Sequence, residues 1–221
     1  MSIKTFYKSI KDLVLGKYTF LLFSLILMIF LMPVSDASGE SLISTIVMSV
    51  ILIGSIYSII QNKKFLYTSI VLVVASLVIN WLQELWPHNS ILHWMFLIQP
   101  IFLLYVTVLI VINMIKAENI TADIILGSMC GYLLVGVTWG LFFEFLIIIE
   151  PNSFSIPIEY ITDSDLYYLS FTTISTLGYG DITPKSSLAK AFCVLEAIIG
   201  LFYVSTLVAR LVALQITKPR R

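Results

Sequence analysis

The residues best suited to chemistry lie in one short segment, Thr-Leu-Gly-Tyr-Gly-Asp at positions 176–181. An ion that leaves water must exchange its hydration shell for oxygen ligands, and successive backbone carbonyls that face one axis supply them. Residues of an ordinary strand alternate in direction, so this arrangement requires left-handed conformations at alternate residues. Glycine adopts them most readily, which explains Gly178 and Gly180. Thr176 adds a hydroxyl at the inner end, and Tyr179 is expected to anchor the backbone against the preceding helix, where its hydroxyl would find a partner.

That preceding helix is predicted from a run at positions 166–175, which is rich in hydroxyl groups and too short to span a bilayer. Asp163 or Ser164 is the expected N-cap of a helix of about three turns. The C-terminal end of this helix would point toward the inner end of segment 176–181. Its negative dipole end would favour a cation there.

The rest of the chain has the composition of an integral membrane protein. Of 221 residues, 59% are hydrophobic and 12% are charged, whereas about a quarter of the residues in soluble domains are charged. This composition excludes disorder and a nucleotide-binding α/β domain. The formal net charge of zero gives no global field that would attract nucleic acid. Six segments meet or approach the roughly 20 apolar residues of a spanning helix: 18–34, 42–60, 65–82, 91–115, 124–149 and 189–216.

Segment 176–181, with its hydroxyl-rich helix between the last two spans, resembles the signature of tetrameric potassium channels. The resemblance covers 124–216, with outer helix, pore helix, filter and inner helix in that family's order. It implies that the potassium-coordinating oxygens come from Thr176, Leu177, Gly178 and Tyr179, and that Gly180 and Asp181 close the outer mouth. Leu177 departs from the valine most often found in the family. Tyr168 stands where the family usually has a tryptophan, and a hydrogen bond from Tyr168 to Asp181 is predicted.

The predicted fold is an all-α membrane protein with six transmembrane helices plus a re-entrant pore helix and selectivity filter, assembled as a tetramer. Fourfold symmetry is the family's way of closing a ring of carbonyls when one chain carries one filter. The predicted division is a cytoplasmic segment 1–17, a four-helix transmembrane domain 18–116, a pore domain 117–217 and a basic cytoplasmic tail 218–221.

The basic residues predict how the chain lies in a cell membrane. If all six segments span, two basic residues, Lys185 and Lys190, fall on one side of the membrane. The other side collects Lys4, Lys8, Lys11, Lys17, Lys63, Lys64, Lys116, Arg210, Lys218, Arg220 and Arg221. Because cytoplasmic loops are rich in lysine and arginine, both termini are expected in the cytoplasm.

Two residues of the last span have alternative interpretations. Gly200 is a candidate gating hinge, since glycine weakens a helix interior, or a small residue that lets helices pack closely. Glu196 is a carboxylate at a depth where charge is costly. It is expected either to face the central cavity and concentrate cations or to lie behind the filter, bonded to Thr172 or Thr173.

The fifth span carries two pairs of glycines four residues apart, Gly127 with Gly131 and Gly136 with Gly140. Small residues at this spacing allow close helix approach in lipid. They predict tight contacts with the inner helix or with the four N-terminal helices, the alternative being the general enrichment of glycine in membrane spans.

The fourth span, 91–115, contains no arginine or lysine. Voltage sensing needs charge that moves in the membrane field, so the usual voltage sensor is not expected. Pro100 is expected to kink this span.

The prediction is therefore a homotetramer in a lipid bilayer that conducts K⁺ passively, without a cofactor beyond the permeant ions and without a nucleic-acid partner. No nucleophile–base pair, metal motif or phosphate loop indicates an enzyme. Two alternatives stay open: a weakly selective cation channel, if Leu177 distorts the filter, and a non-conducting membrane subunit or sensor that retains the pore fold.

Overall fold

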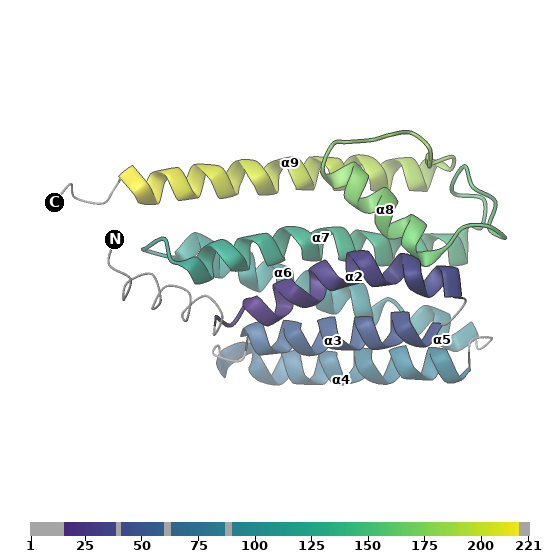
Figure 1. Cartoon of the computed structure of the whole chain (residues 1–221), viewed down its shortest axis with the longest axis horizontal. Coiled ribbons are helices and arrows are strands. Elements are labelled where there is room, and N and C mark those ends of the chain that lie inside the picture. The colour runs from purple at the N-terminus through teal and green to yellow at the C-terminus, as the bar shows by residue number, and fades with distance from the viewer. Residues whose placement is uncertain (1–15, 39–40, 60–62, 87–89, 217–221) are drawn as a thin grey trace.

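The computed structural model describes residues 16–38, 41–59, 63–86 and 90–216, which form an elongated bundle of helices (Figure 1). Within these residues the structure is all α-helical, apart from one isolated bridge between Phe154 and Pro184. The helices are α2 (Thr19–Ser38), α3 (Ser41–Ile59), α4 (Lys63–Leu85), α5 (Ser90–Met95), α6 (Ile98–Lys116), α7 (Ala122–Ile149), α8 (Asp163–Ile174) and α9 (Ser187–Ile216).

Six of the described helices are long and apolar enough to cross a membrane: α2, α3, α4, α6, α7 and α9. The prediction of six spans between polar connections is therefore confirmed, and five of the six helices begin and end within four residues of their expected bounds. Most of the predicted segments 1–17 and 218–221 lie outside the described residues.

The fourth span differs from its prediction. A turn at Phe96 and Leu97 separates the short α5 from α6, so that 91–115 is not one continuous helix. Pro100 is the third residue of α6 and lies in its first turn. Phe96 and Leu97 stand four and three residues before Pro100, which is where the missing N–H and the ring of a proline disrupt a helix. The bend that Pro100 was expected to cause is therefore present, as an interruption of the span between α5 and α6.

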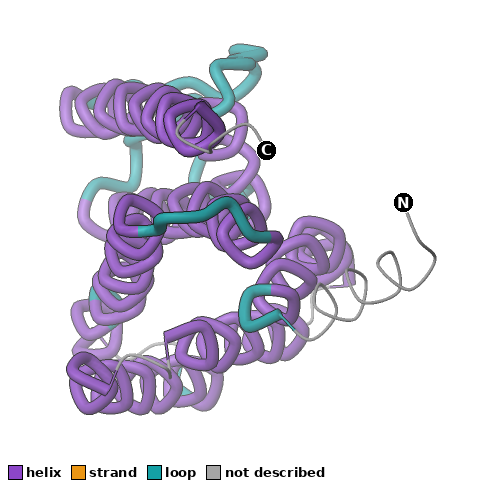
Figure 2. Tube along the Cα trace, turned by 90° about the vertical axis from the view of Figure 1, so that its left-hand side faces the viewer, coloured by secondary structure: helices purple, strands orange, loops and turns teal. Residues whose placement is uncertain are grey.

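The bundle has two parts that share α7. One hydrophobic core fills the space between α2, α3, α6 and α7, with Leu21, Ile51, Phe102 and Leu134 all fully buried. A second core joins α7 to α8, α9 and the connection before α8. An end-on view shows α9 at one edge, with α7 between it and the N-terminal helices (Figure 2). Helix α7 is therefore the wall on which the N-terminal helices and the α8–α9 unit both rest.

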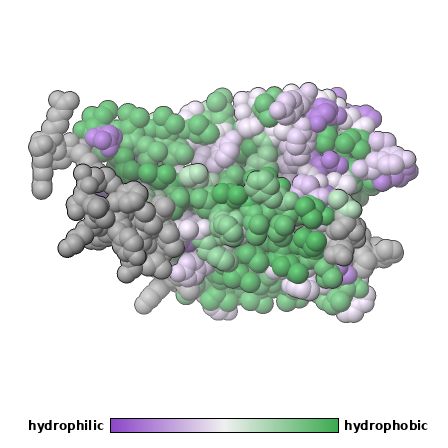
Figure 3. Space-filling model, viewed as in Figure 1, coloured by the Kyte–Doolittle hydropathy of each residue, from purple (hydrophilic) through white to green (hydrophobic). Residues whose placement is uncertain are grey.

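The two ends of the bundle differ in chemistry. Helix α2 begins and α9 ends at one end, and the α8–α9 connection lies toward the other (Figure 1). Lys17 before α2 and Lys116 at the end of α6 thus lie at the first end. Hydrophilic residues gather around the α8–α9 connection, while apolar residues cover much of the length between (Figure 3). This is the surface of a multi-pass membrane protein.

Burial is very uneven among the spans. In the apolar window of α7, 61% of residues are buried, but in that of α9 only 11% are. Large apolar side chains such as Leu201, Phe202 and Val208 of α9 are more than half exposed. Helix α9 therefore offers a long apolar face that the described residues of the same chain do not cover.

Candidate functional site

Helix α8 starts with a capping box. The Thr162 side chain accepts a hydrogen bond from the Asp165 N–H at 3.3 Å, and the Asp165 carboxylate accepts one from the Thr162 N–H at 3.0 Å. The N-cap is therefore Thr162, and not Asp163 or Ser164 as the sequence predicts. Asp36, at the end of α2, accepts from the N–H of Ser164 at 3.0 Å. The Asp165 carboxylate thus satisfies the N–H of the N-cap, and the Asp36 carboxylate satisfies one of the first turn. Both suit the positive dipole end of α8.

Glycines of α7 let α8 lie directly against its backbone. A Cβ atom at Gly136 would lie 2.5 Å from the Phe171 ring, and one at Gly140 would overlap the Tyr167 ring. Both aromatic residues belong to α8. A larger residue at either glycine would require the aromatic ring or α8 itself to move, so these two positions allow α8 to lie close to α7.

The other two glycines of α7 contact the two groups of helices that were predicted as their partners. Gly127 accommodates the Tyr18 ring just before α2, and Gly131 accommodates the hydroxyl end of Tyr203 from α9. Tyr203 then donates to the Ser128 carbonyl at 2.6 Å. The predicted tight contacts with the inner helix and the N-terminal helices are confirmed, whereas the contact of Gly136 and Gly140 with α8 was not foreseen.

The backbone after α8 alternates in handedness. Thr176, Gly178 and Gly180 have φ values of 61°, 50° and 79°. Among the described residues, Thr176 is the one non-glycine residue with a positive φ. Left-handed conformations at Gly178 and Gly180 were predicted, because they allow successive carbonyls to face one axis. The positive φ of Thr176 was not predicted, and it is strained because threonine is β-branched. Such strain persists only where surrounding contacts impose it.

Those contacts come from the last turn of α8. The Thr172 carbonyl accepts from the N–H groups of Leu177 and Gly178 at 2.9 and 3.1 Å, and the Thr173 carbonyl accepts from the Thr176 N–H at 3.0 Å. Carbonyls at a helix C-terminus have no partner within the helix. Here the Thr172 and Thr173 carbonyls hold the start of segment 176–181 against the C-terminal end of α8 and so impose the conformation of Thr176.

The outer end of the segment is held by a side-chain pair. Tyr168 Oη donates to Asp181 Oδ2 at 2.8 Å, which is the hydrogen bond predicted from the sequence. The bond lowers the pKa of Asp181 and raises the pKa of Tyr168 to about 12, because it stabilises the charged carboxylate and the neutral phenol. The effect of this pair on the filter stays a prediction.

The side chains of Tyr179 and Leu177 have little contact with the rest of the chain. Their side chains are 69% and 55% exposed, so Tyr179 is not anchored against α8 of its own chain. A Cβ atom at Gly178 or Gly180 would have no neighbour within 4 Å. The expectation for Tyr179 is wrong within one chain because α8 supplies no surface on that side of the segment.

Glu196 lies against α8 and not in an open cavity. Its side chain is fully buried, and its Oε1 atom is hydrogen-bonded to the Ser170 hydroxyl of α8. The same hydroxyl also lies 2.7 Å from the Gly136 carbonyl of α7. Of the two alternatives the structure has the second, with Ser170 replacing the expected Thr172 or Thr173. Ser170 thus links three helices, a role for which the sequence offered only the hydroxyl-rich character of the run.

Gly200 faces the C-terminal end of α8. A Cβ atom there would lie 2.5 Å from Ile174 Cγ1 and 2.8 Å from the Ile174 carbonyl oxygen. The small residue is therefore required for packing in this conformation. The hinge role of Gly200 stays a prediction.

Residues 129–215 match the family model described as Ion channel. The match begins in α7 and ends in α9, so it contains the whole of α8, segment 176–181, Glu196 and Gly200. It supports an ion channel and covers less than half of the 221 residues. No curated protein and no solved structure matches the chain.

The match coincides with the part of the chain that the site occupies. In this region two spans enclose a short helix and a strained, anchored segment. Irregular backbone is tolerated at membrane depth where it is buried in protein or lines a water-filled path. An ion pathway is the chemistry that this arrangement and the family match have in common.

Proposed function

We propose that the chain is the subunit of a homotetrameric, potassium-selective channel that conducts K⁺ passively through segment 176–181. The observation that carries the proposal is the left-handed backbone at Thr176, Gly178 and Gly180, held under α8 by the Thr172 and Thr173 carbonyls. This alternation is the conformational requirement for successive carbonyls to face one axis. The ion-channel match over the same residues supports it.

In this proposal each residue of the segment has a separate role. The carbonyl oxygens of Leu177, Gly178 and Tyr179, together with oxygens of Thr176, replace the hydration shell of K⁺. Gly180 and Asp181 close the outer mouth, and Tyr168 holds Asp181 in place. Conduction in this proposal needs no cofactor beyond the permeant K⁺ ions, because the oxygens of the segment supply all of their ligands.

The tetramer is proposed because one chain carries one such segment and a closed ring needs several. Two further features support it. The exposed side chains of Leu177 and Tyr179 and the uncovered apolar face of α9 all belong to the α8–α9 unit. Neighbouring copies around a fourfold axis would cover these surfaces with one repeated contact.

Gating without the usual voltage sensor is part of the proposal. Helix α6 carries one basic residue, Lys116, and it lies in the last turn. Charge at the end of a span crosses little of the membrane field, and each elementary charge that does cross contributes about 2.3 kcal/mol per 100 mV. A weak dependence of opening on voltage is therefore expected.

The test is the flux of K⁺ against Na⁺ in liposomes that contain the purified protein. Gly178→Ala forces a side chain into the left-handed region and is expected to abolish selective conduction. Gly54→Ala is the matched control, since Gly54 lies in the middle of α3 and its new Cβ meets the Phe20 ring at 3.2 Å. Selective flux in Gly178→Ala would refute the filter assignment. Equal flux of both ions in the native protein would instead favour a weakly selective channel, and no flux a non-conducting subunit.

A further inference from the structure

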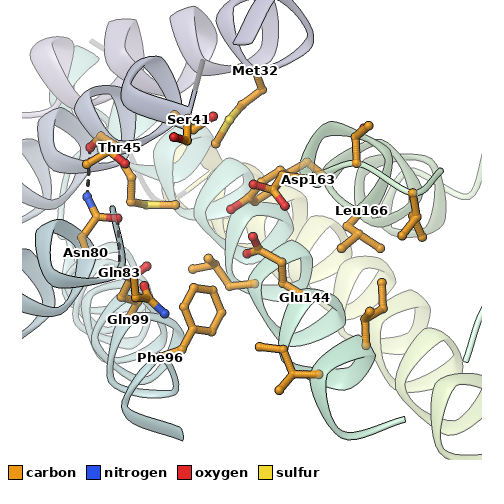
Figure 4. A pocket seen from close by; sticks show the side chains of 18 of the residues that line it. Met32, Ser41, Thr45, Asn80, Gln83, Phe96, Gln99, Glu144, Asp163 and Leu166 are labelled. Carbon is orange, nitrogen blue, oxygen red and sulfur yellow. Dashed lines mark hydrogen bonds between the residues drawn. The ribbon is translucent and has the colours of Figure 1, made fainter. Parts of the chain in front are cut away.

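A cavity of about 500 Å³ lies where the N-terminal helices meet the pore domain, beside the start of α8 (Figure 4). Its walls come from the beginning of α3, the ends of α2 and α4, the turn before α6, the outer part of α7 and the residues that enter α8. The volume falls within the range of about 300–1,000 Å³ typical of small-molecule sites. The cavity shares no residue with segment 176–181.

The lining of this cavity is acidic on two walls. Glu84 lies on the α4 wall, and Glu144 of α7 and Asp163 of α8 lie on the opposite wall. Figure 4 shows the carboxyl groups of Glu144 and Asp163 side by side. None of the described residues that line the cavity is lysine, arginine or histidine. The side chains of Glu144 and Asp163 are hydrogen-bonded to each other, so they share one proton and together carry one negative charge. No basic side chain of the described lining balances that charge.

The two walls differ in how their carboxylates are satisfied. Glu84 accepts hydrogen bonds from Ser41 and Thr45, at 2.7 and 3.1 Å. Glu144 Oε2, by contrast, is buried and receives no hydrogen bond from an N–H group or a hydroxyl of the described residues, and the Glu144 side chain is paired with the carboxyl group of Asp163 alone. A buried carboxyl oxygen without a donor is costly, which makes it a position where a ligand's N–H group would be stabilising.

The neighbouring Asp163 is affected by the same surroundings. Burial raises the pKa of Asp163, its hydrogen bond to Glu144 lowers it, and the nearby Asp36 carboxylate raises it. A cation beside Glu144 and Asp163 would stabilise the charged form of Asp163 and so oppose the effects of burial and of Asp36. A metal ion fits poorly, because no three acidic, histidine or cysteine side chains among the described residues are grouped to hold one. A larger cation with few donors fits better.

The remaining lining supplies the apolar half of such a ligand. Met32, Met48 and Phe96 lie on the side of the cavity formed by the N-terminal helices and the turn before α6. Aromatic and methionine side chains bind flat apolar groups well and adapt to their shape. Acidic oxygens at one wall and an adaptable apolar surface at the other match an amphipathic amine.

We infer that this cavity binds a small organic ammonium cation, with its N–H groups on Glu144 and Asp163 and its apolar part against Met32, Met48 and Phe96. The bound ligand bridges the N-terminal helices to the first turn of the pore helix. Ligand binding would therefore give the four N-terminal spans (α2, α3, α4 and α6) a role that is separate from that of segment 176–181. The inference concerns binding and does not rest on the proposed function.

The probe is 2-phenylethylammonium, and the measurement is a ligand-observed NMR titration of the full chain in lipid nanodiscs, with empty nanodiscs to subtract partitioning. We expect saturable binding, and at least about tenfold weaker binding in Glu144→Gln and in Asp163→Asn, as for loss of a hydrogen bond to a charged group. Glu118→Gln is the matched control, because it removes the same charge from an exposed acid outside the cavity. The neutral analogue 2-phenylethanol should bind weakly or not at all.

Several results would overturn the inference. They are the absence of saturable binding to the native protein, equal binding of the neutral alcohol, and equal weakening by Glu118→Gln. Unchanged binding in both Glu144→Gln and Asp163→Asn would do so as well. Thermal denaturation of each variant shows whether it is folded, and the two cavity variants remove charge from different helices, so a folding failure in one leaves the other to decide. Loss of K⁺ flux in liposomes would bear on the proposed function and not on this site.

Discussion

Gly200→Ala is the most informative change to the pore domain, because it separates packing from hinge bending. The new Cβ atom would lie 2.5 Å from Ile174 Cγ1 and 2.8 Å from the Ile174 carbonyl oxygen. Favourable contacts between such atoms lie at about 3.5–4.0 Å. The side chain of Ile174 can rotate, but its carbonyl belongs to the end of α8 and cannot. Helices α8 and α9 must therefore move apart by roughly 1 Å.

The energetic balance can be worked from general magnitudes. Overpacking of this kind costs about 1–3 kcal/mol, and replacing a glycine inside a helix by alanine returns about 0.5–1 kcal/mol. The limits of the net loss of unfolding free energy are therefore about 0 and 2.5 kcal/mol. The mid-range values give a loss of about 1 kcal/mol, which lowers the melting temperature by roughly 2–4 °C for a chain of this size. Ile174 is two residues before Thr176, so the same displacement should reduce the selectivity for K⁺ over Na⁺.

The assay is thermal denaturation of the purified protein in detergent, paired with flux selectivity in liposomes. Gly54→Ala is the control, since its Cβ would meet a rotatable phenylalanine ring at 3.2 Å and no α8 atom. If Gly200→Ala keeps both the native melting temperature and the native selectivity, and changes the rate of opening alone, the packing argument is wrong and Gly200 is a hinge.

Three further predictions follow from single contacts. Tyr168→Phe removes the hydrogen bond that lowers the pKa of Asp181, so Asp181 should become protonated at a higher pH as the pH falls; a pH titration of K⁺ current, compared with the native protein, checks this. Ser170→Ala leaves the buried Glu196 carboxyl without its hydroxyl partner and should lower the unfolding free energy by about 1–3 kcal/mol. Glu196→Gln can still form a hydrogen bond with Ser170 and should lower the unfolding free energy less. Equal melting temperatures for the native protein and Ser170→Ala would contradict the pairing. Arg210→Met removes the hydrogen bond of 2.7 Å that the Arg210 guanidinium donates to the Ala117 carbonyl, just after α6. This change should uncouple α9 from the α6–α7 connection and alter channel opening. Arg210→Lys should retain part of the contact and so have a smaller effect.

Much of the architecture follows from sequence-local physics. Apolar runs of about 20 residues specify spanning helices because a bilayer leaves backbone groups no other partner. The spacing of Gly178 and Gly180 predicts left-handed backbone conformations at alternate residues, and both glycines have them in the structure. Both inferences need only the residues themselves and their neighbours along the chain. The Tyr168–Asp181 bond was predicted from the resemblance to potassium channels, in which a tryptophan usually stands at the position of Tyr168, and the structure has it.

The remaining features were decided by contacts between distant parts of the chain. Helix rotation placed Glu196 against Ser170, 26 positions earlier, and hydropathy carries no information on that rotation. The partners of Gly136 and Gly140 became visible only when α8 lay on α7. Tyr179 failed as an anchor because the surface that it needs is not provided by the same chain.

The amino-acid sequence by itself thus determined the six spans, the short helix and the alternating glycines, because each depends on local composition and backbone sterics. Only the tertiary structure decided which side chains meet behind the filter, where the fourth span begins and that an acidic cavity lies beside the pore helix. These depend on the rotation and depth of packed helices, which short-range sequence patterns leave free and which steric fit between glycines and aromatic rings fixes.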